Sequence, residues 1–224
     1  MDDLLQILRE MSSVREIIET GDWDGVIKLM QGDRRVDPSD QLSKTEIWGD
    51  IPALLSKSYK KGDRSLLMAA VIGHVEAVDL LVSLGAPLEM KTPSGWTPLF
   101  FAAHFNHPEV VKRLLHHGAD ISARNDQNRT ALYMAIWECL REIVKLLIAA
   151  GSPLDNQDIE GNTPLHRAAG SEKGIALLLL EAGASPSFLD CNGDSPLHLA
   201  ARKNKSDVVR ALAPVTDLNL VGTN

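Results

Sequence analysis

Residues 161–169 read GNTPLHRAA, and the same pattern returns along most of the chain. Its leucine recurs at positions 66, 99, 132, 165 and 197, at intervals of 33, 33, 33 and 32 residues. A nearly fixed period of this length is typical of proteins that stack one structural unit many times. We therefore expect a repeat array instead of a domain with a single central core.

Each unit contains the signals of two short helices. Thr163-Pro164 predicts a helix start, because the hydroxyl caps free N–H groups and proline at the first helical position loses no hydrogen bond. Residues 108–118, PEVVKRLLHHG, show the apolar spacing of a second, antiparallel helix. Gly118 then ends that helix in a left-handed conformation, and an extended arm with a tight turn leads to the next unit.

Residues 161–169 and 108–120 resemble the ankyrin-repeat family, and five copies cover residues 59–219. The resemblance implies an all-α ankyrin-repeat solenoid, made of antiparallel helix pairs with protruding hairpin fingers. It also implies that the chain binds other proteins through its concave side and its fingers. Catalysis is not implied.

The remaining segments are less regular. Residues 1–32 are expected to form N-terminal capping helices, since Ser13 and Glu16 have the spacing of a capping box. Residues 33–58 are expected to be an insertion with a short helix, in which Trp48 either packs or contacts a partner. Residues 220–224 are expected to be a C-terminal tail.

Composition narrows the class of function. The chain has 23 Lys and Arg against 30 Asp and Glu, a net charge of −7, which disfavours binding to a nucleic-acid backbone. No apolar run approaches the ~20 residues that span a bilayer. The two cysteines form no C-x-x-C pair, which suits a reducing compartment. We expect a cytoplasmic or nuclear protein with no membrane partner.

Candidate chemistry is sparse. His104 and His107 have helical ligand spacing, but no carboxylate or cysteine completes a metal set. Residues 156–161 faintly resemble a calcium loop, yet Arg167 stands where a bidentate carboxylate is needed. Phosphate-binding, zinc-protease and serine-hydrolase motifs are all missing. We expect no enzyme activity, no metal and no cofactor.

The resemblance assigns certain positions to the concave groove, namely the arm residues before each Thr-Pro-Leu turn and the last exposed residues of each first helix. Apolar and aromatic side chains cluster there in the first three repeats, although aromatics make up only 4% of the chain. A further expectation is that Arg129 stacks on the Trp96 ring or holds a partner carboxylate. The alternative is that Phe105 and Trp137 fold under the neighbouring finger as local core. The candidate partner-binding residues are Val71, Ile72, Trp96, His104, Phe105, Arg129, Trp137 and Glu138.

These observations favour a protein-interaction module, an adaptor or recognition domain, that is a monomer or part of a hetero-complex. Its partner is expected to be a peptide or helix segment in the concave groove. An alternative is a regulatory inhibitor that docks on a folded enzyme. A third is a structural spacer in which the groove aromatics are inert.

Overall fold

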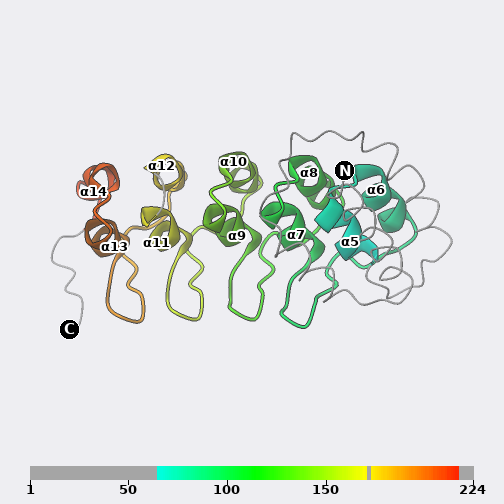
Figure 1. Cartoon of the computed structure of the whole chain (residues 1–224), viewed down its shortest axis with the longest axis horizontal. Coiled ribbons are helices and arrows are strands. Elements are labelled where there is room, and N and C mark those ends of the chain that lie inside the picture. Colours follow the sequence, from blue (N-terminus) through cyan, green and yellow to red (C-terminus); the bar gives the residue numbers. More distant parts are fainter. Residues whose placement is uncertain (1–64, 171–172, 217–224) are drawn as a thin grey trace, which may run out of the picture.

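The computed structural model describes residues 65–170 and 173–216. The expected capping helices at residues 1–32, the insertion at 33–58 and the tail at 220–224 lie outside these described residues. Within them, five antiparallel helix pairs follow one another, and no strand is formed. Numbered as in Figure 1, the helices are α5 (Ser65–Ile72), α6 (Val75–Ser83), α7 (Pro98–His104), α8 (Pro108–His116), α9 (Ala131–Trp137), α10 (Arg141–Ala149), α11 (Pro164–Ala169), α12 (Lys173–Glu181), α13 (Pro196–Arg202) and α14 (Ser206–Leu212).

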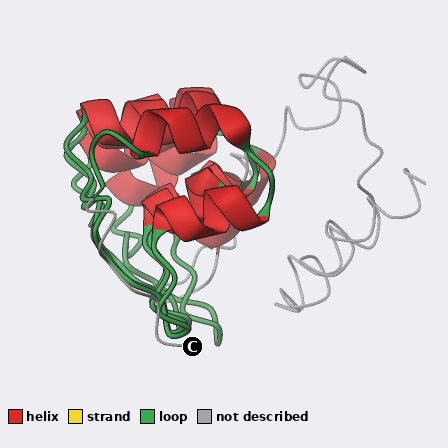
Figure 2. Ribbon diagram, turned by 90° about the vertical axis from the view of Figure 1, so that its left-hand side faces the viewer, coloured by secondary structure: helices red, strands yellow, loops and turns green. Residues whose placement is uncertain are grey.

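The pairs stack side by side into two rows (Figure 1). The first helix of each pair lies in the row next to the loops, which we call the inner helices, and the second helix lies in the outer row. The loops project together from the inner row, as the end-on view in Figure 2 shows. The described part of the chain is therefore an all-α solenoid with protruding fingers, as predicted.

The predicted helix starts are confirmed. Thr97, Thr130, Thr163 and Ser195 have extended backbone, and each side-chain oxygen accepts a hydrogen bond from the N–H group three residues later. Proline follows three of the four at the first helical position. This arrangement satisfies backbone N–H groups that have no partner inside the helix.

Two histidines that recur in the repeat motifs, His166 and His107, bond to the backbone. His166 Nδ1 accepts a hydrogen bond from the N–H of Thr163 at 3.1 Å, so its Nε2 carries the proton and donates to the carbonyl of Asp194 at 3.1 Å. His107 Nε2 similarly donates to the carbonyl of Val71 at 2.8 Å. These bonds join one repeat to the next, which makes the histidines part of the scaffold.

Several turn positions have a left-handed backbone, among them Gly118 and Cys139. Gly118 ends α8 with φ of 90°, as its place in the repeat predicted. Cys139 lies in the turn between α9 and α10, where the other described repeats have glycine or asparagine between their two helices, and its φ is 57°. A residue with a side chain is strained in the left-handed conformation. Packing against the surrounding residues therefore holds Cys139 in this conformation, against the backbone preference of cysteine.

The fingers are four hairpin turns at residues 91–96, 124–129, 157–162 and 190–194. Each contains two backbone hydrogen bonds, such as those from Asp158 N–H to the Asn162 carbonyl at 2.9 Å and from Gly161 N–H to the Asp158 carbonyl at 3.0 Å. Neighbouring fingers are also joined, for example from Ile159 N–H to the Gln127 carbonyl at 3.1 Å. These bonds fix the spacing of side chains at the base of each finger.

Candidate functional site

Six of the eight predicted partner-binding residues lie on α7 and α9, at the ends of these helices, or on the fingers that precede them. We call Trp96, His104, Phe105, Arg129, Trp137 and Glu138 the aromatic strip. Its first half is built on Phe101, which is 2% exposed. The Trp96 ring centroid lies 5.1 Å from that of Phe101, and Phe105 stacks on Phe101 at 6.3 Å with planes 7° apart. Trp96 and Phe105 are thus half-buried and show one side to solvent.

The second half of the strip centres on Trp137, which is 41% exposed. Two guanidinium groups lie over its ring, Arg129 at 5.1 Å and Arg167 at 4.1 Å from the centroid. An Arg167 Nη2 also donates to the Trp137 carbonyl at 3.3 Å, at the C-terminal end of α9. A cation is favoured both on an indole face and at a helix C-terminus, so Trp137 is held in place while it remains exposed.

A contact between His104 and Glu138 connects the two halves. His104 Nδ1 lies 3.5 Å from Glu138 Oε1, and the His104 ring also meets the edges of Trp96 and Phe105 at 5.3 and 4.8 Å. Glu138 caps α9, while His104 is the last residue of α7. The strip is therefore one continuous surface across the second and third repeats.

The Arg129 guanidinium lies against α9 and not on Trp96, where stacking was one of the two roles expected for it. The guanidinium lies over Tyr133 and Trp137, at 5.0 and 5.1 Å, and its Nε donates to Asp158 Oδ2 at 3.1 Å. Asp158 sits in the next finger with a fully buried side chain, so its carboxylate requires a cation. Arg129 pairs with Asp158 and does not stack on Trp96, because the finger directs its guanidinium toward α9 and the following repeat.

The neighbourhood of Asp158 also affects Tyr133. Burial raises the pKa of the Tyr133 hydroxyl, and the nearby Asp158 carboxylate raises this pKa further. Tyr133 thus stays neutral and contributes a hydroxyl donor beside the buried carboxylate.

One predicted residue does not belong to the surface. The Val71 side chain is 4% exposed and packs in the core, because the last turn of α5 lies against α7. Val71 takes part only through its carbonyl, which accepts the His107 bond. Ile72 is half-buried against the same core.

Arg167 was not predicted, although the sequence contains a signal for it. It occupies the α11 position equivalent to Phe101 in α7, Met134 in α9 and Leu199 in α13. A charged residue in a register that is otherwise apolar indicates a specific partner, and here that partner is Trp137.

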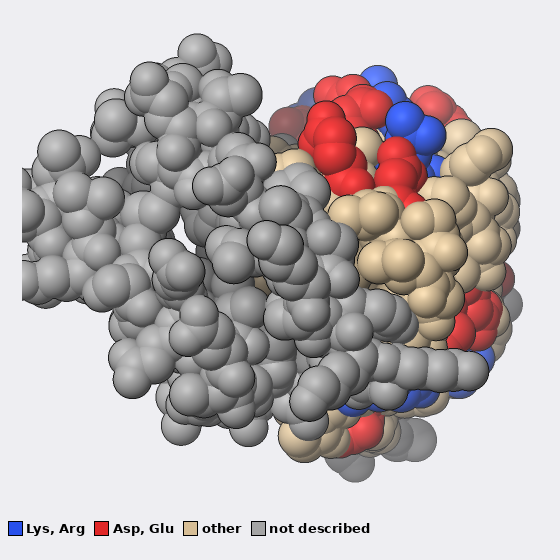
Figure 3. Space-filling view, turned by 90° about the vertical axis from the view of Figure 1, so that its right-hand side faces the viewer, with Lys and Arg blue, Asp and Glu red and all other residues tan. Residues whose placement is uncertain are grey.

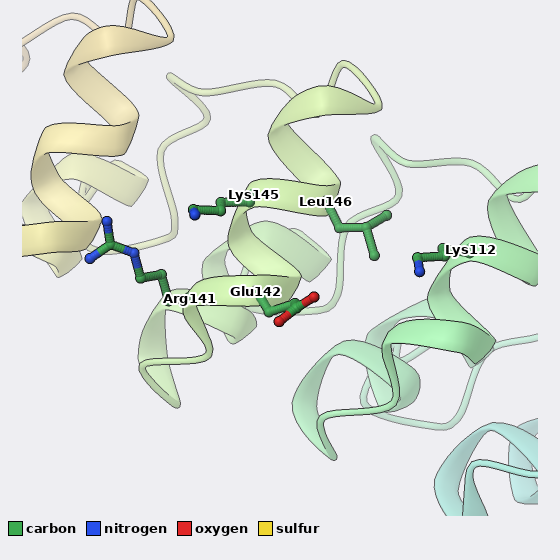
Figure 4. A pocket seen from close by; sticks show the side chains of 5 residues that line it. All are labelled: Lys112, Arg141, Glu142, Lys145 and Leu146. Atoms are coloured by element: carbon green, nitrogen blue, oxygen red, sulfur yellow. The ribbon is translucent and has the colours of Figure 1, made fainter.

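A cavity of about 430 Å³ lies on the outer helices, away from the strip (Figure 4). It is lined by Lys112, Arg141, Glu142, Lys145 and Leu146. Figure 4 shows Glu142 and Leu146 on the side of α10 toward Lys112, and Arg141 and Lys145 toward the other side. A hydrogen bond from Lys112 to Glu109 raises the pKa of that ammonium group. The charged side chains that line this cavity do not place an acid and a base at one common point, as a catalytic site would require.

The end of the stack at α6 also carries mixed charge. Acidic and basic side chains lie next to one another at the top of the face in Figure 3. The outer helices there contain a cross-repeat ion pair in which Asp79 lies 2.9 Å from His117 and 3.5 Å from Arg113. Such contacts support the stacking of α6 on α8.

Residues 65–170 and 173–216 contain no group of three or more His, Cys, Asp or Glu side chains placed to hold a metal ion. None of the helices in these ranges has the length and apolar character needed to cross a membrane.

Stacked helix pairs, aligned fingers and the Thr or Ser caps of α7, α9, α11 and α13 define the described part of this chain as an all-helical repeat protein. A family model described as "Ankyrin repeats (3 copies)" matches residues 49–125, 66–158 and 140–221. The chain belongs to the ankyrin-repeat family, whose members generally bind other proteins. A comparison with curated proteins found no match.

Proposed function

We propose that the chain is a protein-interaction module, an adaptor or recognition domain, that binds a partner segment along the concave groove between inner helices and fingers. It has no catalytic activity of its own in this proposal. The observation that carries it is Trp137, a large apolar ring left 41% exposed yet immobilised by two arginines. Tryptophan and arginine are the residue types that dominate binding energy at interfaces.

The neighbouring residues fit the same role. Trp96 and Phe105 add partly exposed rings next to Trp137, and His104 joins them through its contact with Glu138. Because these side chains are already packed on one another, a partner would order little of the surface on binding. Less conformational entropy is then lost than at a mobile surface.

The test is affinity capture from cell extract with wild-type protein, Trp137→Ala and Leu84→Ala. Leu84 is a matched control because it is 46% exposed and lies at the end of outer helix α6. We expect at least one partner to be retained by wild type and Leu84→Ala but lost with Trp137→Ala, with binding weakened by about 2 kcal/mol or more. Equal capture by all three proteins would contradict the proposal.

A second candidate function is regulatory inhibition of a folded enzyme. Ile159, 63% exposed at a finger tip, favours it, because the tip would contact a folded surface and not a linear segment. If the captured partner is an enzyme, Ile159→Ala should relieve inhibition of its activity. A partner that binds equally well as a short peptide would exclude this candidate.

A further inference from the structure

The inner helices change character along the solenoid. Helices α7 and α9 contribute aromatic residues and no Asp, Glu, Lys or Arg within their bounds. Helix α11 contains Arg167, and α13 ends in Arg202 followed by Lys203, with no acidic residue inside either helix. The inner-helix side thus becomes basic toward the C-terminal end.

The charge of the fingers changes in the opposite direction, from basic to acidic, toward the C-terminal end. Fingers 91–96 and 124–129 contain three basic residues and one acidic residue. Finger 157–162 contains the exposed Glu160 besides the buried Asp158 that pairs with Arg129, and finger 190–194 contains Asp190 and Asp194. Neither finger contains a basic residue. The finger side therefore becomes acidic over the same two repeats in which the helix side becomes basic.

The two sides are close enough to interact. An Arg202 guanidinium at the end of α13 forms an ion pair with Asp194 at the base of the last finger. Lys203 lies over Gly170 of the preceding repeat, with Nζ 3.4 Å from the place a Cβ would take there. The Lys203 ammonium group forms no hydrogen bond or ion pair with another described residue, and Glu160 is exposed. Both sides therefore retain charge for a partner.

We propose that the partner segment is extended and carries alternating acidic and basic side chains over the fourth and fifth repeats, next to an apolar stretch over the aromatic strip. Successive side chains of an extended chain point to opposite sides. Basic side chains would face Glu160 and the last finger, while acidic ones would face Arg167 and Lys203. This inference rests on the proposed function and adds the chemistry of the partner.

The dimensions set the length of the charged stretch. Neighbouring inner helices are spaced by about 10 Å, and an extended chain rises about 3.3 Å per residue. About three residues therefore cover one repeat, and about six cover the two charged repeats.

The experiment compares two labelled peptides of the same composition and zero net charge, using the full chain at low salt. Both contain a Leu-Phe anchor next to three Glu and three Lys. In one peptide the Glu and Lys alternate, and in the other they form two blocks. Each peptide is made in two versions, with the anchor at its N-terminus or at its C-terminus. Fluorescence anisotropy should show the alternating peptide binding about fivefold more tightly, the size expected for two or three exposed ion pairs. Lys203→Glu should remove most of this difference. Lys112→Glu, on an outer helix with its side chain 53% exposed, makes the same charge change and should leave the difference intact.

The outcomes separate the chemistry from the proposed function. If both peptides bind equally well and Trp137→Ala abolishes the binding of both, the proposed charge pattern of the partner is wrong. The groove would still be the binding surface. Tighter binding of the blocked peptide would also overturn the charge pattern and indicate a segment of another conformation. If neither peptide binds, or Lys112→Glu acts as strongly as Lys203→Glu, the charge pattern fails, while the capture experiment with Trp137→Ala still decides the proposed function.

Discussion

Arg129 Nε and Asp158 Oδ2 lie 3.1 Å apart and join two consecutive fingers of the solenoid. The Asp158 carboxylate is fully buried, and its other oxygen accepts hydrogen bonds from the N–H groups of Glu160 and Asn162 at 3.0 and 2.9 Å. In the preceding finger a neutral residue, Asn125, accepts the equivalent bonds from Gln127 and Arg129. An oxygen acceptor at this position is therefore enough to form the turn. Arg129 is needed only because the acceptor in this finger, Asp158, carries a buried negative charge.

The first prediction follows from this difference. Arg129→Met should lower the free energy of unfolding by about 3 kcal/mol, because it leaves a buried carboxylate without its cation. Asp158→Asn should cost only about 1 kcal/mol, since the amide oxygen still accepts the turn bonds. Urea denaturation of the single and double variants measures the coupling. If Arg129→Met costs as much in the Asp158→Asn background as it does in wild type, the two residues are not coupled.

Truncation of the ring side chains distinguishes surface from core. Phe101→Ala should cost about 3 to 5 kcal/mol of stability, because Phe101 is 2% exposed and its loss leaves a cavity. Trp137→Ala should cost no more than about 1 kcal/mol, as expected for an exposed site. Trp96→Ala and Phe105→Ala should fall between these values, since both rings are half-buried. A cost for Trp137→Ala equal to that of Phe101→Ala would favour the local-core alternative.

The pH dependence of stability should carry a contribution from His166. Burial lowers the pKa of His166, which favours its neutral form in the folded state. Its stabilising contribution is therefore complete above the unfolded pKa of about 6.5 and decreases as the pH falls below that value. Thermal unfolding at pH 7.5, 6.5 and 5.5 should show a falling midpoint, with a smaller slope for His166→Asn. An NMR titration in which His166 protonates at the ordinary pKa of histidine would contradict this prediction.

The fifth repeat should open more readily than the second. In α14 only Val208 and Leu212 are buried, whereas all residues of α7 from Pro98 to Ala103 are buried. Fewer buried contacts lower the free energy of local opening. Amide hydrogen exchange in α13 and α14 should be at least about tenfold faster than in α7 and α8. Uniform protection from α7 to Leu212 would show that the last repeat is as stable as the interior.

The repeat, the helix pairs and their caps were all predictable from the sequence, because the interactions that form them are local. The bond from the His166 N–H to Thr163 Oγ1 spans three residues, so both partners can be seen in one short motif. The left-handed turns after the first four helix pairs depend on single glycines such as Gly118. A regular period then implies that each unit packs on the next in the same way.

Contacts between repeats were decided only by the tertiary structure. The Arg129–Asp158 pair spans 29 residues, and the Arg167–Trp137 stack joins α11 to α9, so neither is visible in a local pattern. Val71 and Trp137 are both apolar residues near the ends of inner helices, and both were predicted to bind a partner. The structure shows that Val71 is buried, whereas Trp137 is exposed. The physical reason is that exposure depends on the size and direction of side chains in the neighbouring repeat, which a periodic sequence does not specify.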